Sequence, residues 1–422
     1  MNRSTKTRYI IFQILVEVFK KNKNFETAFN KITAGQELSQ RDISFINNVC
    51  LNSMRRNIYC KLILSKFIKS NLNTNQRILL SSAIVQIVYL KMKPYAVVNE
   101  TVNVAKKVKV FSGFVNAVLK NILNNIYKVS KTEIGLYDFP NWFINQINLS
   151  KNFNADKFIT TFCDYPSLHL VFKSEKYLNN YTEPHTKSSK NSAFVESQKN
   201  INDMPNFKKG EWWVQDFSSM LPLAINPKIK NLQILDLCAA PGGKAFQILS
   251  NNKVVLNDIS LKRISRLQNN LSRLKFNPEI QNLNGLDFDE NYKFDMVILD
   301  APCSSIGTIR KHPEIFFKSN EPDFATLNEL QKNLLQKSSK LIKNKGKIVY
   351  MVCSFFYSET IEIIENFLKK NKNFEIEKYN PNNEFSDIKH LISKEGYFLT
   401  PPASYKTFNI DGFFSVQLIK ND

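Results

Sequence analysis

The 422-residue chain has few glycines, a shortage of acidic residues and no long apolar run. It contains 11 glycines, and its 37 acidic residues face 58 lysines and arginines, which gives a formal net charge of +21. No apolar run approaches the roughly 18 residues that a membrane-spanning helix needs. The first residues lead into a charged amphipathic pattern without a signal-peptide core, so we expect a cytoplasmic protein without membrane contact.

Paired cysteines and the common nucleotide motifs are also missing. The six cysteines form no CxxC pair and have no close histidine partner, which argues against a disulfide framework and against a metal site. There is no spaced GxGxxG and no GxxxxGK[ST], so hydride transfer and ATP hydrolysis are poor matches.

The length and the charge indicate what is present instead. A chain of this size with 43% hydrophobic residues predicts two to three packed domains. The positive charge favours a polyanionic partner, nucleic acid above all, over an acidic small molecule. A general bias of composition toward lysine and asparagine is the alternative explanation for part of this charge.

Three segments differ in their hydrophobic pattern. Residues 1–130 show helical spacing, which predicts an all-α domain. Residues 131–209 hold Pro-aromatic breaks and a polar stretch at 173–209, a loop or small subdomain, so we expect a small α+β linker there. In residues 210–422, short apolar runs alternate with helical patterns, which predicts a parallel α/β sheet with an antiparallel edge strand at 413–419.

Basic residues on the outer faces of the first segment are either a solvated surface or a phosphate-binding surface. We expect Arg310 and Lys311 to add to such a surface beside the site described next. The basic residues assigned to the outer helical faces are Arg3, Lys6, Arg8, Arg55, Arg56, Lys61, Lys66, Lys69, Lys106, Lys107 and Lys109.

The strand ends of the predicted sheet carry residues that suit a nucleotide ligand. In such sheets, ligands bind at the carboxyl ends of the strands. After the strand at 234–237, residues 238–244 are small, with two glycines that let a ligand approach the backbone at a helix N-terminus. Asp258, at the end of the next strand, stands where such sites hold a ribose diol. Alone, these features would be a tight turn and a helix cap, but together they predict an adenosine-containing ligand.

Two further strand ends carry one cysteine each. Asp300 and Cys303 follow one strand, and Cys353 follows another. A single buried cysteine is usually an inert apolar residue, but two at neighbouring strand ends beside a carboxyl group would face one crevice. A helix N-terminus and Lys244 would lower the pKa of a thiol there, and Ser358 would cap the helix that follows.

A thiolate, a carboxyl group and an adenosine ligand together suit one reaction. The C5 carbon of cytosine is too weak a nucleophile to take a methyl group directly. A thiolate that adds to C6 turns C5 into an enamine carbon, which can attack a sulfonium methyl group. A carboxyl group at N3 balances the charge, and a second group helps to eliminate the enzyme. One cysteine therefore attacks, and the other assists the breakdown of the adduct.

At these residues the sequence resembles the RNA 5-methylcytosine methyltransferases, and among them the bacterial Sun or Fmu family, which acts on 16S ribosomal RNA. The helical half resembles the NusB-type RNA-binding domain that this family carries. The matching stretches are 214–216, 238–244, 300–304 with 307 and 310–313, 353–354 with 359, 411–414, and, in the helical half, 41–42, 94–102 and 113–119.

The resemblance implies a NusB-like domain, a linker and a Rossmann-like class I methyltransferase domain, with S-adenosyl-L-methionine as methyl donor and no metal. The implied partner is RNA, namely 16S ribosomal RNA, and not DNA, and we expect a monomer. Cys353 is the implied nucleophile and Cys303 the release assistant. Asp300 is the implied N3 partner, ordered by Lys244, and the carbonyl group of Pro302 is expected to contact the cytosine amino group.

The position of the family's adenine-binding aspartate is Asn284 here, whose amide oxygen can still accept a hydrogen bond, and Asp287 is the alternative. The expected cofactor-binding residues are Cys238, Ala239, Ala240, Pro241, Gly242, Gly243, Lys244, Asp258, Asn284 and Asp300.

Three alternatives remain open at this point. The first is the same chemistry on transfer RNA, because the catalytic motifs do not name the RNA. The second is a NusB-like RNA-binding assembly factor with an inactive methyltransferase half, against which both cysteines and the glycine pair argue. The third is a DNA cytosine methyltransferase, which the second cysteine and the helical half disfavour.

Overall fold

The protein is described by a computed structural model that covers residues 2–150, 153–197, 199–226 and 229–422. The chain forms two compact units. The helical unit holds the residues up to 145, with 154–163 and 309–321, and the sheet unit holds 146–153, 164–308 and 322–422. The segment 131–209, expected as one linker subdomain, is divided between them. In the described part of the chain, no helix is long and apolar enough to cross a membrane.

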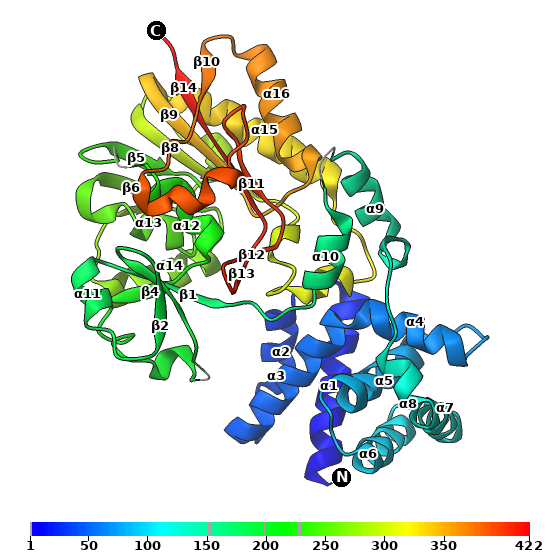
Figure 1. Cartoon of the computed structure of the whole chain (residues 1–422). Coiled ribbons are helices and arrows are strands. Elements are labelled where there is room, and N and C mark those ends of the chain that lie inside the picture. The colour runs from blue at the N-terminus through cyan, green and yellow to red at the C-terminus, as the bar shows by residue number, and fades with distance from the viewer. Residues whose placement is uncertain (1, 151–152, 198, 227–228) are drawn as a thin grey trace. The chain divides into compact units, whose positions relative to one another are not determined.

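The helical unit is built from amphipathic helices, as the spacing of its apolar residues predicts. The apolar faces of α1 and α5 supply buried residues such as Ile14, Val18, Leu80 and Ile84 to one common core. The helices of this part of the chain are α1 (Arg3–Lys21), α2 (Phe25–Thr33), α3 (Gln40–Arg55), α4 (Asn57–Phe67), α5 (Thr74–Ile84), α6 (Pro94–Lys107), α7 (Ser112–Asn124), α8 (Ile126–Ser130), α9 (Asn141–Asn148) and α10 (Ala155–Thr161), coloured blue to blue-green in Figure 1.

The outer-face prediction is wrong for Arg8 and Arg55, which are both buried. The Nε of Arg8 donates a hydrogen bond to Gln86 at 2.9 Å, and the Nη2 of Arg55 donates to the carbonyl oxygen of Arg310, also at 2.9 Å. Their guanidinium groups therefore bind other residues of the helical unit and are not available to a partner in solution. The residues of the set that are exposed, here called the basic face, are Arg3, Lys61, Lys66, Lys69, Lys106, Lys107 and Lys109.

The polar stretch 173–209 folds as part of a small antiparallel sheet in the sheet unit, apart from residue 198, which lies outside the described residues. Its apolar run Ala193, Phe194 and Val195 pairs with the predicted strand at 168–172. The strand order is β2-β3-β1-β4, and the elements are β1 (Leu168–Phe172), α11 (Glu175–Asn179), β2 (His185–Ser189), β3 (Ser192–Val195) and β4 (Trp212–Val214).

The main sheet confirms the predicted parallel α/β pattern. Five neighbouring strands, in the order β9-β8-β5-β6-β7, run parallel. The bounds are β5 (Gln233–Asp236), β6 (Lys253–Asn257), β7 (Glu279–Gln281), β8 (Phe294–Asp300), β9 (Ile342–Val352), β10 (Phe374–Glu377), β11 (Phe398–Thr400) and β14 (Phe413–Lys420), and a separate hairpin is formed by β12 (Ala403–Tyr405) and β13 (Phe408–Ile410).

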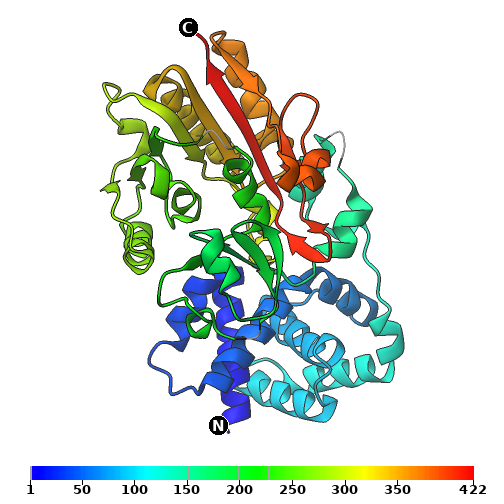
Figure 2. The ribbon, with the colours of Figure 1, turned by 60° about the vertical axis from the view of Figure 1, so that its left-hand side comes forward.

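The last strand occupies another position in the sheet than the predicted one. β14 is antiparallel to β9, as expected, but it is not the edge, because β10 pairs with its other side. Its first six residues are buried, which suits a strand with neighbours on both sides. Figure 2 shows β14 in red as one long strand through the sheet.

Alternate residues of the strands face two different helical layers. Ile234, Met296 and Ile298 pack in one cluster with residues of α12 (Phe217–Ala224), α13 (Gly243–Phe246) and α14 (Leu261–Leu274). Leu235 and Val297, one position further along, pack in the other with α15 (Phe324–Leu341) and α16 (Ile361–Lys370). Figure 1 shows α15 and α16 together on one side of the sheet. This period of two leaves the carboxyl ends of the parallel strands free to carry a site.

Candidate active site

The predicted site residues come together at one edge of the main sheet. Because β9, β8, β5 and β6 are parallel neighbours, their carboxyl ends lie side by side. Cys353 follows β9, Cys303 follows β8, the loop 238–242 follows β5, and Asp258 follows β6. Within the described residues, no group of three or more His, Cys, Asp or Glu side chains is placed to hold a metal ion.

The loop after β5 is closely packed against the helices behind it. Gly242 has a φ of +109°, a conformation that favours glycine, and a Cβ there would lie 2.2 Å from the ring of Phe246 and 2.7 Å from Leu267. The side chain of Asn270 donates a hydrogen bond to the carbonyl oxygen of Pro241 at 3.2 Å. These contacts hold the loop in one conformation at the start of α13.

Asp258 orders the same loop from the end of β6. Its Oδ2 accepts a hydrogen bond from the backbone N–H of Ala240 at 3.2 Å, and its Oδ1 accepts one from Ser260 N at 2.9 Å. Arg263 forms an ion pair with it at 2.9 Å. The Asp258 side chain is 0% exposed, so a contact with a ribose requires one of these partners to move.

Lys244, in α13, and Asp300, the last residue of β8, form a partly buried ion pair. The Lys244 Nζ and the Asp300 Oδ2 lie 2.6 Å apart, and the two side chains are 16% and 31% exposed. Burial alone lowers the pKa of the Lys244 ammonium group, but the charge and hydrogen bond of Asp300 outweigh it and raise the pKa. Lys244 therefore stays charged and lies within hydrogen-bond distance of the carboxyl group of Asp300.

Cys303 and Cys353 lie with their sulfur atoms 3.3 Å apart. The Cys353 Sγ is also 3.4 Å from the hydroxyl group of Ser305. The hydrogen bond from Cys303 lowers the pKa of Cys353, against the effect of burial. The same bond and burial raise the pKa of Cys303 well above its usual value. Of the two thiols, Cys353 therefore loses its proton more readily than Cys303.

Asp236, the last residue of β5, is a buried carboxyl group that the sequence interpretation did not single out. Burial first, and the negative charge of Asp300 next, raise its pKa to about 8, while Lys244 opposes this shift. Its position directly before the predicted loop was the signal in the sequence that could have identified it.

Glu359 is a second carboxyl group whose place in the site the sequence pattern does not define. It ends the short helix η8 (Tyr357–Glu359) and is 0% exposed. Its side chain accepts hydrogen bonds from Ser304 N at 2.7 Å, from the Ser304 hydroxyl at 2.6 Å and from the Ser354 hydroxyl at 2.6 Å. It therefore joins the loop of Cys303 to the loop of Cys353.

Two glycines bring the turn before β14 onto the same loops. Gly307 N donates to the carbonyl oxygen of Cys353 at 3.0 Å, and Gly412 N donates to Gly307 O at 2.8 Å. A Cβ on Gly307 would lie 2.0 Å from Gly412 O, so no side chain fits. Asp216 accepts a hydrogen bond from Asp411 N at 3.2 Å, which ties the predicted stretch 214–216 to this turn.

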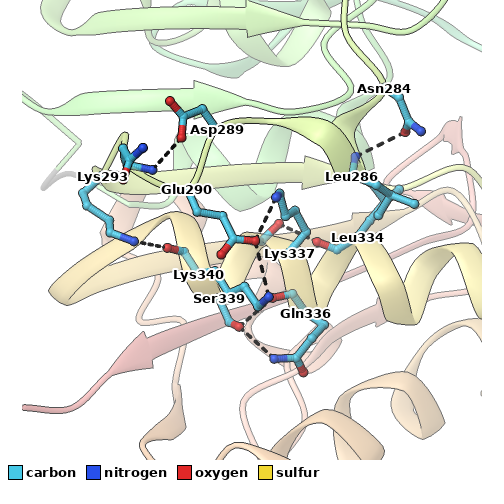
Figure 3. A network of polar contacts seen from close by, with 12 residues as sticks. Asn284, Leu286, Asp289, Glu290, Lys293, Leu334, Gln336, Lys337, Ser339 and Lys340 are labelled. Carbon is cyan, nitrogen blue, oxygen red and sulfur yellow. Dashed lines mark hydrogen bonds and ion pairs between the residues drawn. The ribbon is translucent and has the colours of Figure 1, made fainter.

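Asn284 and Asp287 are both exposed after β7. The Asn284 Oδ1 accepts a hydrogen bond from Leu286 N at 3.2 Å, so its side chain caps the short helix η5 (Gly285–Asp287). Further along, Glu290 pairs with Lys337 of α15 at 2.8 Å (Figure 3). This pairing anchors the segment to α15. The contact of Asn284, or of Asp287 as the alternative, with an adenine stays a prediction.

Three expectations need correction or refinement. Ser358 does not cap the helix after Cys353; its hydroxyl group donates to Gln146 at 2.7 Å, and α16 begins after Thr360 without a side-chain cap. Arg310 is 1% exposed and donates from Nε to the carbonyl oxygen of Thr161 at 3.0 Å, so it is not a surface phosphate ligand. The Pro302 carbonyl already accepts one hydrogen bond, from Gln331 at 2.8 Å, which leaves one lone pair for a base.

The chain matches two family models. Residues 222–419 match the model described as 16S rRNA methyltransferase RsmB/F, and residues 5–124 match the NusB family. A relative from Photorhabdus laumondii, named ribosomal RNA small subunit methyltransferase B, is 28% identical over 395 residues, which are 88% of this chain and 91% of the relative. A relative of the same name from Pectobacterium atrosepticum is 28% identical over 411 residues, 92% of each chain.

Solved structures share the fold. The protein PH0851 superposes with a TM-score of 0.72 at 19% identity, covering 100% of this chain and 99% of that chain. The structure of NSun6 from Pyrococcus horikoshii with SFG has a TM-score of 0.56 at 15% identity, covering 67% of this chain and 99% of that chain.

Proposed function

We propose that this chain methylates C5 of a cytosine in 16S ribosomal RNA through a covalent cysteine adduct, because residues 5–124 match the NusB family and residues 222–419 match the family of 16S rRNA methyltransferases RsmB/F. The observation that carries the proposal is the pair of thiols 3.3 Å apart, with the pKa of Cys353 lowered by its partner, beside the Lys244–Asp300 ion pair. A methyl transfer to oxygen or nitrogen has no use for two such thiols.

The residues of the site fit S-adenosyl-L-methionine, whose bound analogue in the related NSun6 structure supports the choice. The loop 238–243 is small and held close, and the carboxyl groups of Asp258 and Asp300 lie at this edge of the sheet. These groups can accept hydrogen bonds from the hydroxyl and ammonium groups of the ligand. S-adenosyl-L-methionine supplies an electrophilic methyl group. Asp258 toward the ribose and Asn284 toward the adenine stay predictions.

Cys353 carries out the first step. Its thiolate adds to C6 of the cytosine, which forms the S–C6 bond and makes C5 nucleophilic. The electron pair that this addition displaces reaches N3, which takes a proton from the carboxyl group of Asp300 and returns it when C5 is methylated. Lys244 holds that carboxyl group in place. C5 then takes the methyl group and still carries its hydrogen atom.

Cys303 carries out the release. Once Cys353 is bonded to carbon, its negative charge is gone, and with it the main cause of the raised pKa of Cys303. Cys303 can then give its own proton to water and, as a thiolate, accept the hydrogen of C5 as a proton. The electron pair of the C5–H bond reforms the C5–C6 double bond, the S–C6 bond breaks, and Cys353 leaves as a thiolate.

The cytosine must leave its stack to reach Cys353, so the target is an unpaired or flipped base. The NusB-type helical unit and its basic face are the proposed RNA-binding surface. Action in the cytoplasm and a monomeric state stay predictions.

The test is to incubate the purified chain with labelled S-adenosyl-L-methionine and, separately, 16S RNA, transfer RNA or duplex DNA. The proposal expects label in 16S RNA, loss of transfer with Cys353→Ala, and a trapped protein–RNA adduct with Cys303→Ala. Label in transfer RNA alone would replace the substrate. Equal loss in both variants with no adduct would overturn the covalent mechanism.

A further inference from the structure

Glu359 receives more hydrogen bonds than a residue with only a packing role needs. Its carboxyl group is fully buried and accepts from Ser304 N, from the Ser304 hydroxyl and from the Ser354 hydroxyl, all at 2.6 to 2.7 Å. Short hydrogen bonds of this kind are typical of a charged acceptor. The two serines are in different loops, which follow β8 and β9.

The donors of these bonds stand next to the two cysteines in the chain. Ser304 directly follows Cys303, and Ser354 directly follows Cys353. One carboxyl group thus joins the two reacting loops one residue beyond each sulfur atom. The backbone of Glu359 is itself fixed, because its carbonyl oxygen accepts the Tyr350 hydroxyl at 2.9 Å.

Gln331 of α15 completes the arrangement from the other side of the Cys303 loop. Its Nε2 donates to Glu359 Oε1 at 3.3 Å and to the carbonyl oxygen of Pro302 at 2.8 Å. Pro302 directly precedes Cys303, so the loop is held on both sides of the thiol. Gln331 is 0% exposed, and water does not compete for these bonds.

We propose that Glu359 is a positioning residue that holds the Cys303 loop against the Cys353 loop and thereby controls the release of methylated RNA more than the first addition. The inference rests on the proposed function. In the addition step only the sulfur atom of Cys353 bonds to the base, and Cys303 contributes through its hydrogen bond to that sulfur atom. Release needs Cys303 at the hydrogen of C5 while Cys353 is still bonded to C6, so it depends on the distance between the two thiols, here 3.3 Å.

Glu359→Gln keeps the shape of the side chain but replaces one acceptor oxygen by an NH2 group, which faces serine donors. We expect release to slow about tenfold or more, because a misplacement of up to 1 Å costs up to about a hundredfold in rate. The rate of addition should change by less than about threefold, since Cys353 directly follows β9, which stays in the sheet. At steady state, the fraction of the protein in covalent complex with RNA should therefore rise.

The experiment measures methyl transfer and covalent adduct together for the full chain with 16S RNA and labelled S-adenosyl-L-methionine. Glu365→Gln is the matched control, because Glu365 is an exposed glutamate of α16 that accepts one hydrogen bond, from Tyr357 at 2.9 Å. Cys303→Ala, which is expected to trap the adduct, gives the maximum adduct fraction for comparison. A lower turnover of Glu359→Gln with a higher adduct fraction than the native chain supports the inference.

A purely structural role predicts a different pattern, namely that turnover and adduct fraction fall in parallel in Glu359→Gln, and this result would overturn the inference. If that variant does not fold, Ser304→Ala decides, because it removes one of the bonds and keeps Ser304 N in place; an adduct fraction equal to that of the native chain would then contradict us. If Cys303→Ala itself yields no adduct, the proposed function fails first, which separates the two claims.

Discussion

Replacing Gly307 by alanine should damage both the stability of the sheet unit and the position of the nucleophile. The three atoms nearest to its Cβ would all be backbone atoms: Gly412 O at 2.0 Å, Gly412 C at 2.6 Å and Cys353 O at 3.0 Å. No side chain can rotate away, so the turn before β14 and the loop after β8 must separate by at least about 1 Å to reach ordinary contact.

The magnitude follows from what this separation breaks. Overpacking of this kind costs about 1–3 kcal/mol. The hydrogen bonds from Gly307 to Cys353 and from Gly412 to Gly307, of 3.0 and 2.8 Å, would lengthen, at about 0.5–1.5 kcal/mol each. The total loss is about 2–6 kcal/mol of unfolding free energy, and a shift of the Cys353 loop by about 1 Å lowers adduct formation about a hundredfold.

The assay is urea unfolding followed by circular dichroism, together with the rate of covalent adduct formation with 16S RNA in a Cys303→Ala background. Gly135→Ala is the matched control, since a Cβ there meets nothing within 4 Å and its φ of −110° is open to alanine. The control should be unchanged or slightly more stable. If Gly307→Ala unfolds at the same urea concentration as the control and forms adduct at the same rate, the close approach of these loops has been misjudged.

Three further changes test other parts of the site. Lys244→Met removes the cation that orients Asp300, so kcat should fall about a hundred- to a thousandfold with a smaller change in KM for RNA, measured by methyl transfer. In Cys303→Ala the pKa of Cys353 rises, because the hydrogen bond that lowers it is removed; the pH profile of adduct formation should shift to higher pH, and Cys303→Ser, which keeps a donor, should shift less. Neutralising the lysines of the basic face should weaken RNA binding. It should also make the slope of log K against log salt concentration less steep, by about 0.7–0.9 for each RNA phosphate that the protein no longer neutralises. Neutralising exposed lysines of 173–209 should change RNA binding little.

Much of the fold follows from local pattern, because period-two strands and 3.6-period helices are properties of neighbouring residues. For this reason the sequence predicts the parallel strands and the residues that follow them. The fold of the stretch 173–209 does not follow from its sequence, since its few apolar residues, such as Phe194, form a strand only through pairing with β1. The place of β14 inside the sheet depends on β10, a four-residue strand with too little pattern to predict.

In the site, too, some positions follow from local pattern and others depend on contacts between distant segments. Cys303, Cys353, Lys244 and the loop after β5 are marked by where they stand relative to strands, and the topology brings them together. The bridging position of Glu359 depends instead on how the chain turns back after β9, which no spacing specifies. The positive charge of Arg310 predicts a place on the basic surface beside the site, whereas its burial follows from contacts with distant segments.

The most direct test of the central claim is to identify the residue that carries RNA in the trapped complex. Cys303→Ala is incubated with 16S RNA and S-adenosyl-L-methionine, the complex is digested, and the peptide bonded to a nucleotide is sequenced by mass spectrometry. The account predicts a 5-methylcytosine adduct on Cys353. An adduct on any other cysteine, or methylated RNA released at the native rate with none on Cys353, would contradict it.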